Sequence, residues 1–155
     1  MNENRLIEED LIAYAKPFLK QQGFKKKNKR WTKVEEEFTL VFWIQGSSWD
    51  KGEYYVRPGI FINGLEPPAF VEGHLSTEID RQTPEQVMRD SMRFFNKWTD
   101  KNFFRERLEA FMEWEKRNPL EKRRANEVDY EKDPVPAEEL FELSERAKKY
   151  ILKHF

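Results

Sequence analysis

The sequence predicts an α+β fold, in which one N-terminal helix and two or three C-terminal helices pack on an antiparallel sheet of about four strands. Three observations support this class. The chain starts with a helical apolar pattern, runs of β-branched and aromatic residues follow between residues 30 and 79, and helical patterns return after residue 83. Strands joined by short connections pair antiparallel, which leaves the helices to cover the sheet.

The N-terminal segment has the periodicity of an amphipathic helix. Its apolar residues recur at three- and four-residue steps: Leu6, Ile7, Leu11, Ala15, Phe18 and Leu19. Pro17 lies inside this pattern and predicts either a kink or the start of a second short helical turn. Gly23 then supplies a helix stop, because glycine readily adopts the left-handed conformation that follows many helices.

Three strands are predicted next, with one more short strand expected in residues 69–79. Residues 30–36 form a short strand, and residues 37–45 are apolar on both faces, which is typical of a central strand covered on both sides. Residues 53–63 form the third strand. Pro58 and Gly59 interrupt it, which predicts a bulge or an edge position.

The second half of the chain has strong helix signals. Thr83, Pro84 and Gln86 combine an N-cap residue, a proline in the first turn and a capping-box partner. The apolar pattern that follows has a break near Thr99 and Asp100, so two helices or one bent helix are expected. The second helical pattern is expected to end at Asn118 and Pro119.

Chain length predicts a single domain over residues 1–155. Its core is expected in residues 1–117, followed by a charged, mobile connection over residues 118–135. Residues 136–153 then form a last amphipathic helix, whose acidic start and basic end complement the helix dipole.

Composition excludes several classes of function. The 28 basic and 29 acidic residues give a net charge of −1, so no overall field attracts the chain to nucleic acid or membrane. Cysteine is absent, which excludes disulfides, thiolate nucleophiles and cysteine-ligated zinc. No apolar run approaches the ~20 residues of a membrane-spanning helix, and the start of the chain is too charged for a signal peptide. A cytoplasmic protein without a cofactor is expected.

Catalytic chemistry has one weak candidate, the group His74, Glu78 and Asp80. An imidazole beside carboxylates can hold a metal or relay a proton. The spacing matches no known ligand motif, however, and a structural histidine is the better interpretation. No catalytic residue and no metal site are predicted.

A basic run lies between the first helix and the first strand, and it has two interpretations. Its residues are Lys25, Lys26, Lys27, Lys29 and Arg30, followed by Trp31. The cations can pair with phosphates while the indole stacks on a base, which describes a nucleic-acid site. Alternatively, the lysines solvate a loop, cover apolar surface and deter sheet-to-sheet pairing. The net charge favours the second interpretation.

Two segments, residues 18–33 and 40–62, resemble a bacterial family known as domain of unknown function 4304. The matching positions are Leu19, Lys20, Gly23, Phe24, Lys25, Lys26, Trp31, Gln45, Ser47, Trp49, Gly59 and Ile60. The resemblance covers about the first half of the chain, and the helical second half matches only in general character. The family tends to have an asparagine before its glycine, where Arg57 and Pro58 stand here. The resemblance implies no catalytic residue, because the family has none assigned.

Gln45, Ser47 and Trp49 have a joint interpretation at the end of the central strand. The glutamine amide can pair with the backbone of the following turn, and the serine can cap the same turn. The indole then folds over it. This group is interpreted as a structural corner first and a ligand corner second.

The leading functional hypothesis is a small non-catalytic bacterial protein that binds another protein, as an immunity-like or regulatory factor. Its candidate surface consists of Gln45, Ser47, Trp49 and Arg57, because tryptophan and arginine often anchor protein interfaces. One alternative is a nucleic-acid-binding module that uses the basic run Lys25–Arg30. A second alternative is an enzyme with an unrecognised site near His74. The oligomeric state stays open.

Overall fold

The computed structural model describes residues 6–46, 53–66, 68 and 73–155. The chain divides into two compact units, unit 1 (Met1–Thr99) and unit 2 (Asp100–Phe155). Each unit buries large aromatic side chains of its own, and each is described by itself. The expectation of one domain over residues 1–155 stays a prediction.

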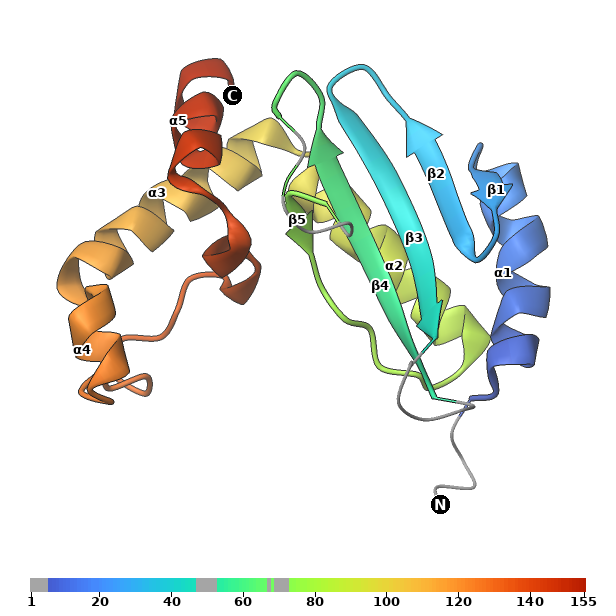
Figure 1. Cartoon of the computed structure of the whole chain (residues 1–155), viewed down its shortest axis with the longest axis horizontal. Coiled ribbons are helices and arrows are strands. Elements are labelled where there is room, and N and C mark those ends of the chain that lie inside the picture. The colour runs from blue at the N-terminus through green and yellow to red at the C-terminus, as the bar shows by residue number, and fades with distance from the viewer. Residues whose placement is uncertain (1–5, 47–52, 67, 69–72) are drawn as a thin grey trace. The chain divides into compact units, whose positions relative to one another are not determined.

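Unit 1 is an antiparallel sheet with helices packed on it, which confirms the α+β class (Figure 1). Its elements are α1 (Glu8–Gln21), β1 (Lys25–Lys27), β2 (Arg30–Val34), β3 (Phe38–Gly46), β4 (Tyr54–Ile62), β5 (Leu75–Ser76) and α2 (Pro84–Trp98). The strands lie in the order β1-β2-β3-β4-β5, so that each pairs with its neighbour in sequence. Helix α2 packs on β4 and α1, and α1 packs on β1.

The sheet has five strands because the basic run itself forms the edge strand β1. Lys25 pairs with Thr32 and Lys27 with Arg30, so the expected basic turn is a β-hairpin. Asn28 lies at its tip with φ 59°, a left-handed conformation that asparagine tolerates better than most residues. Lysines on an edge strand hinder pairing with a second sheet, which suits this position.

Gly23 ends α1 as predicted. The N–H of Phe24 donates to the Leu19 carbonyl over 2.9 Å, and the N–H of Gly23 donates to the Lys20 carbonyl over 3.1 Å. This pair of bonds is the Schellman motif, and Gly23 has the positive φ of 91° that the motif requires. Helix α1 is continuous through Pro17, so the predicted second helical turn does not form.

Strand β4 runs without interruption through Pro58, which pairs with Phe42 of β3. The carbonyl of Pro58 accepts from the N–H of Thr77, on the side away from β3. The nitrogen of a strand residue faces the same side as its carbonyl, so β3 requires no N–H from residue 58. The proline therefore costs the β3–β4 ladder no hydrogen bond. Both predicted alternatives, a bulge and an edge position, are wrong, because the β3–β4 register is unbroken and β4 lies between β3 and β5.

The face of the sheet that α2 covers forms the core of unit 1, with β3 at its centre as predicted. Its strand side chains are each at most 6% exposed: Trp31, Leu40, Phe42, Ile44, Val56 and Ile60. Phe24 joins them by packing on Phe95 of α2, with ring centroids 5.8 Å apart. Each such side chain contributes about 1.5–3 kcal/mol by burial. The opposite face is only partly covered, since Val41 is buried but Trp43 is half-buried.

Unit 2 is helical. It contains α3 (Lys101–Arg117), α4 (Leu120–Arg124), the 3-10 helix η1 (Glu138–Glu142) and α5 (Glu145–His154). The predicted break near Thr99 and Asp100 is confirmed, because the Asp100 carboxylate caps α3 by accepting from the N–H of Phe103 over 3.1 Å. Residues 136–153, expected as one helix, form two segments. Ser144 starts the second by accepting from the N–H of Ala147.

The charged connection contains α4 and is tied to α3 through Asp133. The Asp133 carboxylate accepts from Arg117 at 3.0 and 2.9 Å and from the side-chain amide of Asn118 at 2.8 Å. Its backbone carbonyl accepts from the indole N–H of the buried Trp114 at 2.9 Å. The sequence pattern predicted only a mobile segment over residues 118–135 and did not predict these contacts.

Across the described residues, every helix is too short or too polar to span a lipid bilayer.

Candidate functional site

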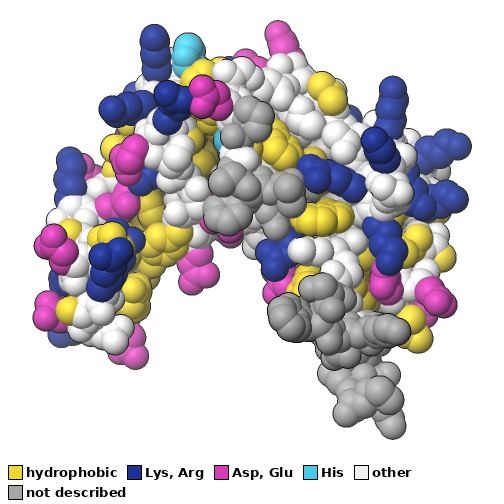
Figure 2. All heavy atoms as spheres, in the orientation of Figure 1, with side chains coloured by type: hydrophobic (Ala, Val, Ile, Leu, Met, Phe, Trp, Pro, Cys, Tyr) yellow, Lys and Arg dark blue, Asp and Glu magenta, His cyan; other side chains and the backbone are white. Residues whose placement is uncertain are grey.

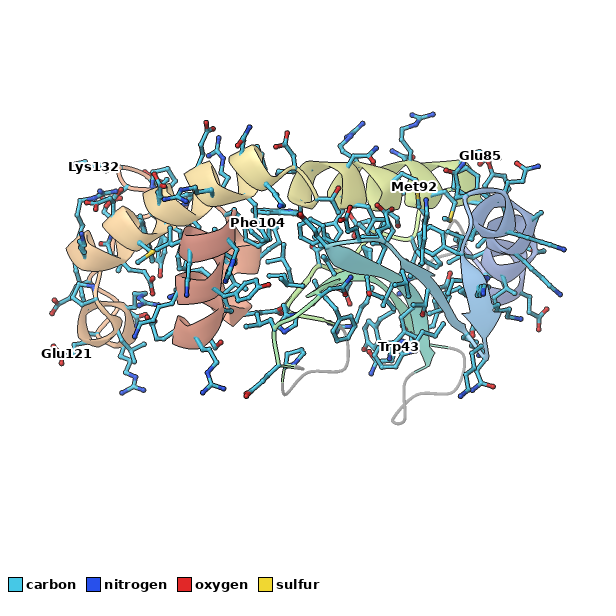
Figure 3. All side chains as sticks on the ribbon, turned by 90° about the horizontal axis from the view of Figure 1, so that it is seen from above. Trp43, Glu85, Met92, Phe104, Glu121 and Lys132 are labelled. Carbon is cyan, nitrogen blue, oxygen red and sulfur yellow. The ribbon has the colours of Figure 1, made fainter. Side chains whose placement is uncertain are left out.

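The sheet face turned away from α2 is the candidate functional site. Strand alternation places every second side chain there, and Figure 3 shows Trp43 on this side of the sheet. We call the surface the aromatic–arginine face and define it by Arg30, Trp43, Gln45, Tyr55, Arg57 and Phe61. All six side chains are half-buried or exposed. In Figure 2, hydrophobic and basic side chains lie next to one another over β2, β3 and β4.

Strand register sets the centre of this face. Arg30 of β2 and Arg57 of β4 are the two cross-strand partners of Trp43, so a cation flanks the indole on each side. The Arg30 guanidinium lies 5.7 Å from the centroid of the Trp43 ring and 5.9 Å from that of Phe61. In contacts of this kind the guanidinium is attracted to the electron-rich faces of the aromatic rings.

Arg57 adds a second stacked guanidinium. It lies 5.6 Å from the ring centroid of Tyr55, a residue that is 37% exposed. Its Nη2 atom is 3.8 Å from Glu78, a long ion pair between exposed groups that contributes little stability. Among the described residues, the buried Nε–H of Arg57 has no acceptor. Arg57 therefore lies on the surface with a weak ion pair and one unsatisfied donor.

Two of the four residues predicted as a binding surface lie on this face. Gln45 pairs with Tyr55 across β3 and β4, and Arg57 follows two positions along β4. Ser47 and Trp49 lie outside the described residues. Trp43 was missed as a site residue, although the alternation of β3 already placed it opposite Phe42.

A family profile covers most of this chain. The profile of a domain of unknown function, DUF4304, matches residues 15–131. The chain belongs to this family. The match begins within α1 and ends beyond α4, so it extends further than the resemblance in the first half of the sequence. No curated protein and no solved structure matches the chain.

In this DUF4304 domain, the six residues of the nucleic-acid alternative do not form one surface. Lys26 pairs with Trp31 on the helix-covered side, and Trp31 is only 1% exposed under an edge contact with Phe42. Arg30 lies on the aromatic–arginine face, and Lys29 forms an ion pair with Glu8. The predicted stacking of a base on Trp31 therefore has no exposed ring to use.

His74 has a structural environment in this DUF4304 domain. Its Nδ1 atom accepts from the N–H of Ile62 at 2.9 Å, and its Nε2–H donates to the Glu66 carbonyl at 2.7 Å. Both ring nitrogens are thus occupied by backbone groups. Burial lowers the pKa of His74, partly opposed by the bond to Glu66, so the neutral ring is favoured.

The carboxylates expected near His74 do not form a metal site with it. Glu78 faces Arg57. Over the part of the chain that the structure describes, no group of three or more histidine, aspartate or glutamate side chains is arranged to hold a metal ion.

Proposed function

We propose that this chain is a non-catalytic bacterial protein-binding domain, an immunity-like or regulatory factor of the cytoplasm, which holds its partner on the aromatic–arginine face. The observation that carries the proposal is the row Arg30, Trp43, Arg57 across three neighbouring strands. Tryptophan, tyrosine and arginine dominate the binding energy of protein interfaces. A rigid sheet presents them without the entropic cost of ordering a loop.

The charge of the aromatic–arginine face indicates the charge expected of its partner. Arg30 and Arg57 flank the indole, and Glu78 is the acid paired with Arg57 at its border. A complementary surface carries carboxylates around an apolar or aromatic centre. We therefore expect an acidic protein partner, as in complexes where an inhibitor neutralises an enzyme by charge complementarity.

The test is affinity capture from nuclease-treated bacterial lysate with the tagged chain and with its Trp43→Ala and Arg57→Ala variants. Truncating an interface anchor costs 2 kcal/mol or more, so each variant should weaken the captured complex by about 30-fold or more in calorimetry. Leu120→Ala is the matched control, because it truncates a residue of unit 2 that is 49% exposed. Partner binding that is equal in all four proteins would contradict the proposal.

The nucleic-acid alternative predicts the opposite pattern. Binding would be lost on nuclease treatment and would fall by ~0.7–0.9 log units per log unit of salt for each phosphate contacted. A complex that survives nuclease but weakens with Trp43→Ala separates the two functions.

A further inference from the structure

Unit 2 has an exposed aromatic pair that the proposed function does not use. Tyr130 and Phe141 are 52% and 43% exposed. Both rings contact the fully buried indole of Trp114, with ring centroids 6.3 Å and 5.7 Å from it. Phe141 also packs edge-on against the buried Phe111, at 5.2 Å. One buried indole therefore holds exposed rings from two separate segments in the same part of unit 2.

The backbone around Tyr130 is held in place by hydrogen bonds. The Asp129 carboxylate accepts from the N–H of Glu131 at 3.2 Å, which closes the turn that carries Tyr130. At the end of this turn, the Asp133 carbonyl accepts from the indole N–H of Trp114 at 2.9 Å. The ring is thus presented without the entropic cost of ordering a loop.

Acidic side chains accompany both rings. Residues 127–145 contain eight acidic side chains and one basic side chain. Glu131 directly follows Tyr130, and Glu138 lies three positions before Phe141 in the 3-10 helix η1. Because such a helix has three residues per turn, the Glu138 and Phe141 side chains lie one above the other. We call this surface the aromatic–acidic patch and define it by Tyr130, Glu131, Glu138 and Phe141.

The two carboxylates of the patch are available to a cation. Glu131 and Glu138 are both exposed. Within the described part of the chain, neither has an ion-pair partner. A ligand of the patch is therefore expected to carry positive charge around an apolar or aromatic centre.

The aromatic–arginine face of unit 1 has this composition. It presents Arg30 and Arg57 on the two strands that flank Trp43. Guanidinium and carboxylate groups form strong charge-assisted hydrogen bonds, and aromatic rings on both sides add apolar contact. Like charges oppose contact between two faces or between two patches. The favourable contact therefore joins one face to one patch.

We propose that the aromatic–acidic patch of one copy of this chain binds the aromatic–arginine face of a second copy. The contact joins two different surfaces, so each end of the complex keeps one open surface and further copies add head to tail. This inference rests on the proposed function, because it uses the same face. It adds a form of regulation, since a second copy competes with the acidic partner for the face at high protein concentration.

The test is sedimentation velocity of the full chain from about 10 μM to about 1 mM. The average mass should rise with protein concentration and should fall when salt screens the charges. A face variant, Trp43→Ala/Arg57→Ala, and a patch variant, Glu131→Lys/Glu138→Lys, should each associate about 30-fold more weakly or worse. Glu106→Lys/Glu121→Lys is the control for the patch variant, because it makes the same charge change at other exposed acids of unit 2. It should associate like the unmodified chain.

A mixture of the two variants identifies the surfaces in contact. The face variant keeps its patch and the patch variant keeps its face, so equal amounts should form a complex with one copy of each. This complex should not grow, because the surfaces left at its ends are both altered. A contact between like surfaces would not be restored by mixing.

Self-association is overturned if the full chain stays monomeric up to about 1 mM, if either variant alone associates like the unmodified chain, or if the mixture forms no complex. It is also overturned if the control variant loses association. The capture assay separates this failure from that of the proposed function. A monomeric chain whose captured partner still depends on Trp43 overturns self-association alone. Association as expected, with equal capture by the chain and its Trp43→Ala variant, overturns the binding of another protein alone.

Discussion

At the scale of single residues, His74 joins the end of β4 to the loop that follows it. Its folded-state pKa lies below the ordinary value of 6.5, chiefly because of burial. The unfolded chain therefore binds a proton at a higher pH than the folded chain does. This contribution to stability is fully present above pH 6.5 and is lost as the pH falls toward the folded pKa.

We expect the His74→Asn variant to test this linkage. At pH 7.5 it should be less stable, because the bonds to Ile62 and Glu66 are lost or weakened. The unmodified chain should lose more stability than the variant between pH 7.5 and pH 5.5, as measured by urea unfolding. Parallel pH profiles for the two proteins would show that His74 is not the titrating group.

Gly73 places His74 by a close backbone approach. A Cβ atom at residue 73 would lie 2.7 Å from the carbonyl oxygen of Ile60, and φ is 135°. We expect Gly73→Ala to lower the free energy of unfolding by about 3 kcal/mol, from strain and steric overlap together. Gly46→Ala is the control, since no described residue beyond its chain neighbours lies within 4 Å of its added Cβ, and it should be nearly neutral in the same unfolding assay.

At the scale of elements, Asp133 fastens the charged connection to the end of α3. Hydrogen bonds from Arg117 and then Asn118 lower the pKa of Asp133 from 3.8 to about 2. A carboxylate with a lowered pKa stabilises the fold above pH 3.8, and that contribution is lost as the pH falls through about 2.

Asp133→Ala should therefore lower the thermal midpoint of unfolding at pH 7, while Glu131→Ala, an exposed acid of the same segment, should change it less. The difference between Asp133→Ala and the unmodified chain should shrink below pH 3.8. A constant difference down to pH 2 would indicate that the carboxylate charge is not involved.

The elements of this chain differ in how well the sequence predicts them. Gly23 and Thr83 mark helix ends through local backbone chemistry, and both act as expected. Strand β1 was missed because three consecutive lysines show no apolar alternation, and only pairing with β2 makes them a strand. The Asp133 contacts join residues 15 to 19 positions apart, a distance that periodicity does not encode.

The candidate site shows the same limit. Arg57 and Gln45 were identified from residue type and family pattern, whereas Trp43 was missed because residues 37–45 were expected to be covered on both faces. The approach of Arg30 to Trp43 depends on the β2–β3 register, which the sequence leaves open.

At the scale of the whole chain, charge is balanced in number but separated in space. Unit 1 has 15 basic and 15 acidic residues, yet its residues 16–33 are purely basic among the charged types. Net charge alone thus gives no measure of the local potential that a ligand meets.

Each unit buries large side chains of its own, which leads to a prediction about cooperativity. Leu108 is fully buried in α3, and Leu108→Ala should destabilise unit 2 by about 2–5 kcal/mol. Hydrogen exchange should then show lost protection in α3 and α5, with β3 and β4 protected as before. Equal loss of protection in β3 and α3 would instead support one cooperative domain over residues 1–155.

Alternate residues of strand β3 serve two purposes, since one set packs in the core and the other set forms the outer surface. Phe42 and Ile44 hold the sheet to its helices, while Trp43 and Gln45 face outward. A substitution can therefore change a surface residue without changing the core, or the reverse. Inserting or deleting a single residue changes both, because it moves every following side chain to the other face of the sheet. We expect related sequences to differ from one another in β3 by substitutions and to have neither insertions nor deletions in this strand.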